Sequence, residues 1–205
     1  MIPDYVTHYH LSDRQPFLSL SDLDGGIEHP IFAEMLNKHK RDSNYSRIYT
    51  RKYLDIRKRV ETKLRALFEE RGGKPKRVHP FYCILGDSNW FRFLNRDHEQ
   101  IRIAIADLPE ESTSLTFPDS FVAMSRKEKP YFEQVYFLSE LESLVAAHGI
   151  PKDEVPVSYE KYWQGDLEKY IEVQIWDDAV SETYRKKSEC QQFPGGDSLK
   201  ATPQE

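Results

Sequence analysis

Cysteine is scarce in this sequence, and long apolar runs are missing. Cys83 and Cys190 are the only cysteines, one in an apolar run and the other in a polar stretch. Such different settings indicate neither a disulfide framework nor a zinc site. No run approaches the roughly 18 apolar residues of a membrane span, and the first ten residues lack the basic-then-apolar form of a signal peptide. We therefore expect a cytoplasmic protein with no membrane partner.

The motifs of several large enzyme classes are also missing. The sequence contains no GxGxxG, no P-loop, no HExxH, no GxSxG and no paired CxxC, which argues against the nucleotide, metal and hydrolase sites built on them. His8 and His10 lie two apart, but no cluster of carboxylates nearby completes a metal site. Cys83 is an unsuitable nucleophile because it lies in an apolar run that reads as a buried strand. We expect no metal ion.

Charge is nearly balanced, and aromatic residues are frequent. The formal net charge of −5 argues against a protein that coats nucleic acid, but it leaves room for a local basic patch. Aromatic residues make up 13% of the chain, which fits a ligand or nucleic-acid surface as well as a core. The length predicts a single domain over residues 1–180, and the polar composition of residues 181–205 predicts a disordered tail.

The stretch Tyr170–Trp176 alternates strictly between two kinds of residue. Ile171, Val173 and Ile175 fall on one face of a strand, as expected for a core. The other face carries Glu172 and an amide between two large aromatic residues. Such a face suits the wall of a cleft for a flat polar ligand, although an edge strand with Glu172 in water fits the same pattern.

Other segments predict an α+β fold. Strands are expected at residues 5–11, 79–86, 101–106, 115–117 and 134–138, and helices at residues 30–40 and 45–71 and after Ser139. A split β-sheet packed around a cleft accounts for this order. The helical segment 45–71 is the longest and holds nine Arg or Lys against four Asp or Glu. This excess indicates either a solvated basic face or a surface that faces phosphates.

Four short stretches share their order and residue types with one enzyme family. They are Tyr9–Ser12, Arg77–Tyr82, Phe117–Met124 and Ile171–Val173. Together they resemble the Tyr-His-Ile-Thr element, the Tyr-Val-Pro-Phe-Tyr strand, the Phe-Thr-Asp-Gly-x-Ala-x-Met stretch and the glutamate strand of the DarT-type ADP-ribosyltransferases. The resemblance spans residues 5–178 as islands. It departs from the family at Ser120, which replaces a glycine, and in the long interval between Asp119 and Glu172.

The resemblance implies an ADP-ribosyltransferase-like split β-sheet around an NAD cleft, in which several residues have roles. The charge count of residues 45–71 adds a long basic helix in the N-terminal half. Glu172 would stabilise the positive charge that develops on the ribose when nicotinamide leaves. Arg51 would bind the diphosphate, with Arg47 as the alternative. The other residues expected to contact NAD are His10, Ser12, Tyr82 and Trp90. Trp176 is a further candidate for ring stacking, and the triplet Ser112–Ser114 is a candidate for shaping the pocket.

The function implied by the resemblance is transfer of ADP-ribose from NAD to DNA or RNA. The setting would be a bacterial toxin held by an antitoxin, or a defence against phage. An ADP-ribosyltransferase that modifies a protein or a small molecule is the first alternative. The second alternative is an inert nucleic-acid- or protein-binding module of the same fold. A metal-dependent nuclease is disfavoured because carboxylates do not cluster in the sequence.

Overall fold

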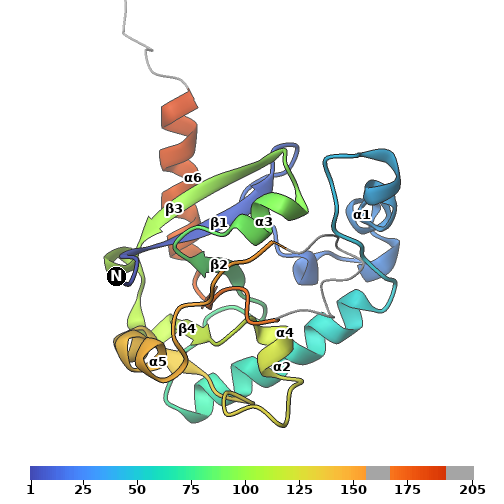
Figure 1. Ribbon diagram of the computed structural model, residues 1–205. Helices are drawn as coiled ribbons and strands as arrows, with labels where there is room; N and C mark the ends of the chain where they lie inside the picture. Colours follow the sequence, from blue (N-terminus) through green and yellow to red (C-terminus); the bar gives the residue numbers. More distant parts are fainter. Residues whose placement is uncertain (156–166, 193–205) are drawn as a thin grey trace, which may run out of the picture.

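A computed structural model describes residues 1–155 and 167–192, with side chains up to residue 186. In these ranges, six strands form one antiparallel sheet in the order β3-β1-β2-β6-β4-β5 (Figure 1). The strands are β1 (Tyr5–Leu11), β2 (Phe81–Leu85), β3 (His98–Ala104), β4 (Thr113–Thr116), β5 (Tyr136–Phe137) and β6 (Glu172–Ile175). The helices are α1 (Pro30–Arg41), α2 (Tyr53–Glu70), α3 (Asn89–Leu94), α4 (Ser120–Ala123), α5 (Leu141–His148) and α6 (Asp178–Gln192). The predicted α+β class is confirmed.

Strand β6 lies inside the sheet, between β2 and β4. Val173 is paired with Cys83 on one side and with Leu115 on the other. Its two faces differ as the alternation predicts. Ile171, Val173 and Ile175 belong to the main apolar core, and that core also holds Leu144 of α5 and Tyr184 of α6. Helices α5 and α6 therefore cover this face.

The opposite face of β6 is covered by α2. Trp176, just after the strand, packs with Leu64 and Phe68 of this helix. Glu172 and Gln174 lie on the same face and are also buried. A third apolar cluster, beside the sheet, joins Phe32 and Met35 of α1 to the loop that precedes α2. That loop, residues 42–52, connects the two helices (Figure 1).

Strands β1 and β2 separate after a short paired stretch. Seven residues of β1 are paired with β3, but only Val6 and Thr7 are paired with β2. Beyond Thr7, a side chain replaces the backbone ladder, since the His8 ring nitrogen Nδ1 lies 3.0 Å from the Tyr82 carbonyl oxygen. The sheet is therefore one hydrogen-bonded unit that opens locally, not two separate halves as the predicted split sheet would have it.

Two expectations from composition are wrong in the described part of the chain. Residues 181–192 are helical in α6, where Val180 and Tyr184 are buried against the core. The predicted tail therefore does not begin at residue 181, and residues 193–205 lie outside the described residues. Helix α2 is not strongly basic, because Tyr53–Glu70 contains five Arg or Lys and four Asp or Glu. Most of the local basic excess lies in the preceding loop.

Candidate functional site

A cavity of about 210 Å³ opens where β1 and β2 separate. Both strands contribute to its walls, together with the loops after β1 and before α2. Its charged and ring-bearing lining residues are Glu172, Arg14, Arg47, Arg57, His8, His10, His98, Tyr9, Tyr45, Tyr49, Phe81, Tyr82, Phe91, Phe121 and Tyr170. The volume is below the roughly 300–1,000 Å³ of pockets that enclose a drug-sized ligand. The cavity is therefore too small in this form to enclose a complete dinucleotide.

Glu172 is a buried carboxylate in the cavity wall, only 6% exposed. Its Oε1 accepts hydrogen bonds from the Ser120 backbone N–H and from Gln174 Nε2, both at 3.1 Å. Burial and the nearby negative charge of Asp119 raise the pKa of Glu172 to about 7, against the hydrogen bonds that favour the charged form. Near neutral pH this group can therefore exist in either protonation state. A raised pKa in a cavity is a common feature of functional carboxylates.

A buried hydrogen-bonded chain orients Glu172 from behind. Gln174 Nε2 also donates to Thr116 Oγ1 at 3.0 Å, and Gln174 Oε1 accepts from Ser114 Oγ at 2.8 Å. Ser114 Oγ in turn accepts from Trp176 Nε1 at 2.8 Å. This chain fixes the Gln174 amide so that its nitrogen faces Glu172. Ser114 and Trp176, both candidates for the pocket, therefore stabilise the carboxylate from within the fold and do not line the cavity.

Asp119 is a second carboxylate near Glu172. It caps α4, where its Oδ1 accepts from the backbone N–H groups of Phe121 at 3.0 Å and Val122 at 3.2 Å. Burial raises the pKa of Asp119 to about 6, although the capping bonds and the charge of Arg47 act in the opposite direction. Two neighbouring buried carboxylates disfavour double ionisation. Asp119 thus raises the proton affinity of Glu172 and also fixes α4, whose Ser120 donates to Glu172.

Arg47, in the loop before α2, and Arg57, near the start of α2, both line the cavity. Arg51 does not. The Arg47 guanidinium lies 4.8 Å from the Tyr49 ring centre, and its Nη2 donates to the Tyr53 hydroxyl at 3.2 Å. Arg57, one turn into α2, lies 4.3 Å from the Tyr82 ring centre. Arg51 is exposed on the loop between them. Of the two arginines predicted for the diphosphate, Arg47 lines this cavity and Arg51 does not.

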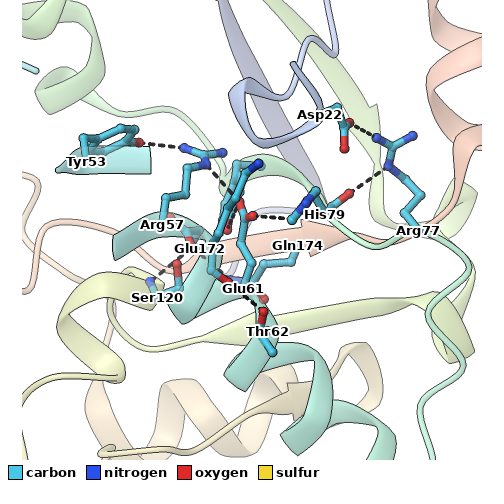
Figure 2. Close-up of polar contacts among 12 residues, drawn as sticks. Asp22, Tyr53, Arg57, Glu61, Thr62, Arg77, His79, Ser120, Glu172 and Gln174 are labelled. Atoms are coloured by element: carbon cyan, nitrogen blue, oxygen red, sulfur yellow. Dashed lines mark hydrogen bonds and ion pairs between the residues drawn. The ribbon is translucent and has the colours of Figure 1, made fainter. Parts of the chain in front are cut away.

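Glu61 is not found by sequence reasoning, yet it is fully buried beside the cavity. Its Oε1 accepts from Arg57 Nε at 2.9 Å and from the Tyr82 hydroxyl at 3.1 Å, and its Oε2 lies 2.6 Å from His79 Nδ1. Figure 2 shows Glu61 between Arg57 and His79. Helical spacing could have indicated it, since Glu61 lies seven residues from both Leu54 and Phe68 on the buried face of α2.

The two histidines of β1 lie in different settings. His8 Nε2 accepts from the Phe17 backbone N–H at 2.8 Å, so the proton is on Nδ1, which donates to the Tyr82 carbonyl. Burial lowers the pKa of His8 to about 4, so the ring is neutral near pH 7. His10 also lines the cavity, and its Nδ1 lies 3.0 Å from the Leu11 carbonyl oxygen. Both histidines line the cavity, and the two hydrogen bonds of His8 also connect the Phe17 loop to β2.

Of the remaining residues predicted to contact NAD, one lines the cavity and two do not. Tyr82 lines the cavity. Ser12 does not line it and is exposed in the turn after β1. Trp90 is 6% exposed and stacks on Phe93 at 5.8 Å, outside the cavity, because the helical turn of α3 directs it into the fold. The cavity thus brings together Glu172, Arg47, His10 and Tyr82, and it excludes Arg51, Ser12 and Trp90.

No group of three His, Cys, Asp or Glu side chains suited to a metal ion occurs in residues 1–155 and 167–186. Within the described ranges, no helix has the length and apolar character required to cross a membrane. Comparisons with protein-family models, with curated proteins and with solved structures gave no significant match.

Proposed function

We propose that the protein is an NAD-dependent ADP-ribosyltransferase whose reaction centre is the cavity between β1 and β2. One observation carries this proposal: a buried carboxylate, Glu172, lines the same aromatic cavity as the guanidinium groups of Arg47 and Arg57. A carboxylate suits a sugar that becomes cationic, and guanidinium groups suit a diphosphate. The resemblance to DarT-type enzymes at Glu172 and His10 points to the same chemistry.

In the proposed reaction, the bond between ribose C1′ and the nicotinamide nitrogen breaks, and its electron pair leaves with nicotinamide. The ribose then has oxocarbenium character, which the ionised Glu172 stabilises electrostatically. A nucleophilic nitrogen or oxygen of the acceptor attacks C1′. Its proton passes to Glu172 or to water. Arg47 and Arg57 hold the diphosphate, and aromatic rings such as Tyr82 and Tyr49 contact the flat groups of the substrate.

The proposed acceptor is DNA or RNA. Arg51 and Lys52 are exposed on the loop that also carries Arg47 of the cavity wall. Exposed cations at the rim of a reaction centre suit the phosphates of a nucleic-acid acceptor, even in a protein whose overall charge is negative. By the same resemblance, we propose a bacterial toxin that an antitoxin protein restrains, or an enzyme of phage defence.

The test is transfer of radiolabel from NAD, labelled in the adenylate phosphate, to purified DNA and RNA. Replacing Glu172 by Gln should reduce transfer about 100- to 1,000-fold, as for other preorganised electrostatic groups. Glu142→Gln, on the exposed side of α5, is the matched control and should transfer label like the parent. Equal labelling by the parent and by Glu172→Gln would refute the proposal.

Digestion of the labelled product distinguishes a nucleic-acid acceptor from a protein acceptor. Label that nuclease releases supports a nucleic-acid acceptor, whereas label that only protease releases indicates transfer to protein. If neither NAD consumption nor label transfer occurs, the inert binding module of the same fold is the better description.

A further inference from the structure

Glu61 is an unusual residue for the middle of a helix face that packs on a sheet. Its side chain has no exposed surface, and it lies in α2 between the buried residues Leu54 and Phe68. Removing a carboxylate from water costs several kcal/mol, so such a group persists where its partners compensate for the lost water. The hydrogen-bond partners of Glu61 therefore indicate its role.

Two of these partners line the cavity. Arg57 Nε donates to Glu61 Oε1 at 2.9 Å, and the Tyr82 hydroxyl donates to the same oxygen at 3.1 Å. One carboxylate oxygen thus joins a guanidinium on α2 to a phenol on β2, and it fixes the stacking of Arg57 on the Tyr82 ring. On its other side, Glu61 meets His79, just before β2 (Figure 2).

Among the described residues, the other contacts of Arg57 leave one guanidinium nitrogen for a ligand. Its Nη1 donates to the Tyr53 hydroxyl at 2.7 Å, and its Nε is bound by Glu61. Nη2 has no hydrogen-bond partner within the described ranges, and Arg57 lines the cavity. The guanidinium is therefore held at two of its three nitrogens, an arrangement that preorganises the third for an anion.

We propose that Glu61 is a positioning residue: it holds Arg57 and Tyr82 at the cavity wall so that Arg57 binds the diphosphate of the substrate. This inference rests on the proposed function. Glu61 itself touches no substrate. Its effect passes through Arg57, so the two residues should be strongly coupled.

The same helix supplies a matched control. Arg65 and Glu69 form the same i,i+4 pair at 3.1 Å, but both side chains are partly exposed, and neither lines the cavity. Glu69→Gln therefore removes the same charge from the same helix without acting on Arg57.

The experiment measures the binding of inorganic pyrophosphate and of NAD by calorimetry. In the otherwise unchanged protein, Glu61→Gln should weaken pyrophosphate binding about tenfold. In a protein that already carries Arg57→Gln, the same substitution should weaken it less than about twofold, because Glu61 acts through Arg57. Glu69→Gln should leave binding within about twofold of the parent, as expected for an exposed pair. In label-transfer assays, Glu61→Gln should raise the KM for NAD about tenfold and change kcat less than about threefold, since Glu172 still faces the ribose.

The decisive result is whether Glu61→Gln weakens or tightens pyrophosphate binding. If Glu61 merely neutralised Arg57, its removal would leave more positive charge and would tighten pyrophosphate binding, which would overturn the inference. Unchanged binding, or an equal loss in the Arg57→Gln background, would also overturn it. A parent that binds pyrophosphate but not NAD would refute the proposed function, while the pyrophosphate data would still decide the role of Glu61. A parent that binds neither would refute both.

Discussion

Glu172 shows how the surroundings of one residue determine its chemistry. Its hydrogen bonds to Ser120 and Gln174 favour the carboxylate, but burial and Asp119 outweigh them and raise its pKa to about 7. The same group would be an ordinary acid on an exposed strand. Preorganised buried charges of this kind are costly for stability and useful for chemistry.

The raised pKa predicts opposite effects of pH on stability and on activity. Between about pH 4.5 and pH 7, the folded protein keeps a proton on Glu172 that the unfolded chain releases, so stability falls as the pH rises through this window. The loss should reach roughly 3 kcal/mol by pH 8. The transfer rate should instead rise through about pH 7, as the carboxylate forms.

Urea unfolding of the parent and of Glu172→Gln at pH 5 and pH 8 measures this effect. The substituted amide cannot ionise, so the variant should be the more stable of the two at pH 8 and should lose this advantage at pH 5. Because Asp119 and Glu172 interact, the difference between the parent and the variant reports the titration of the carboxylate pair. The same stability difference at both pH values would contradict the prediction.

Arg47 and Arg51 provide a second prediction, because they lie four residues apart and only Arg47 lines the cavity. Arg47→Gln should weaken NAD binding about tenfold or more, the usual effect of losing a charged hydrogen bond. Arg51→Gln should leave NAD affinity within about twofold, as expected for an exposed site. Isothermal titration with NAD distinguishes them, and a larger loss in Arg51→Gln would show that NAD binds elsewhere.

Among the elements, α6 differs most from its predicted character. A polar composition predicts disorder when no apolar stripe is visible, but Val180 and Tyr184 bury one side of the first turns of this helix. Tyr184 also bonds to β3, where its hydroxyl accepts from the Ala104 N–H at 3.3 Å. Arg185 donates to the Pro16 and Phe17 carbonyls, both at 3.1 Å. The helix therefore stabilises the loop that carries Arg14 and Leu18 of the cavity wall.

Tyr184→Ala should accordingly lower the free energy of unfolding by about 3 kcal/mol, because it removes a large buried ring. Glu182→Ala, exposed on the same helix, should change it by less than about 0.5 kcal/mol. Denaturation in urea, followed by circular dichroism, measures both. A disordered segment at this position would give no effect for either variant.

At the scale of the whole molecule, the cavity joins segments that are far apart in sequence. Its walls combine β1, the loop before α2, β2 and β6, which the chain reaches over more than 160 residues. A ligand that contacts all of them holds these segments together, and binding to the folded state alone raises its stability.

NAD should therefore raise the melting temperature. At an NAD concentration of 100 times the dissociation constant, the free energy of unfolding rises by about 2.7 kcal/mol. For a protein of this size, that corresponds to a melting temperature higher by roughly 5–10 °C. Differential scanning fluorimetry measures the shift, and ATP at the same concentration tests whether the nicotinamide half contributes. A protein that melts at the same temperature with and without NAD would match the inert module.

Much of the fold follows from local patterns. Residues 5–11 are a strand with the predicted bounds, and the apolar run Phe81–Leu85 and the alternating stretch around Ile103 are also strands. The predicted start of the helix at residue 45 is wrong, since α2 begins at Tyr53. The loop before it is held by tertiary contacts, such as the bond from the Ser46 N–H to the Leu94 carbonyl. No local pattern reports such contacts.

Strand alternation alone was enough to predict which faces of the strands are apolar, because successive side chains point to opposite sides and burial follows that alternation. It therefore placed Glu172 on the face away from the main core. The side chains that meet Glu172 were settled by the three-dimensional fold. The separation of β1 from β2 and the turn of the loop before α2 bring Arg47 and Arg57 to the cavity and leave Arg51 in solvent. The positions of these arginine side chains depend on contacts between distant segments, and periodicity along the chain does not encode such contacts.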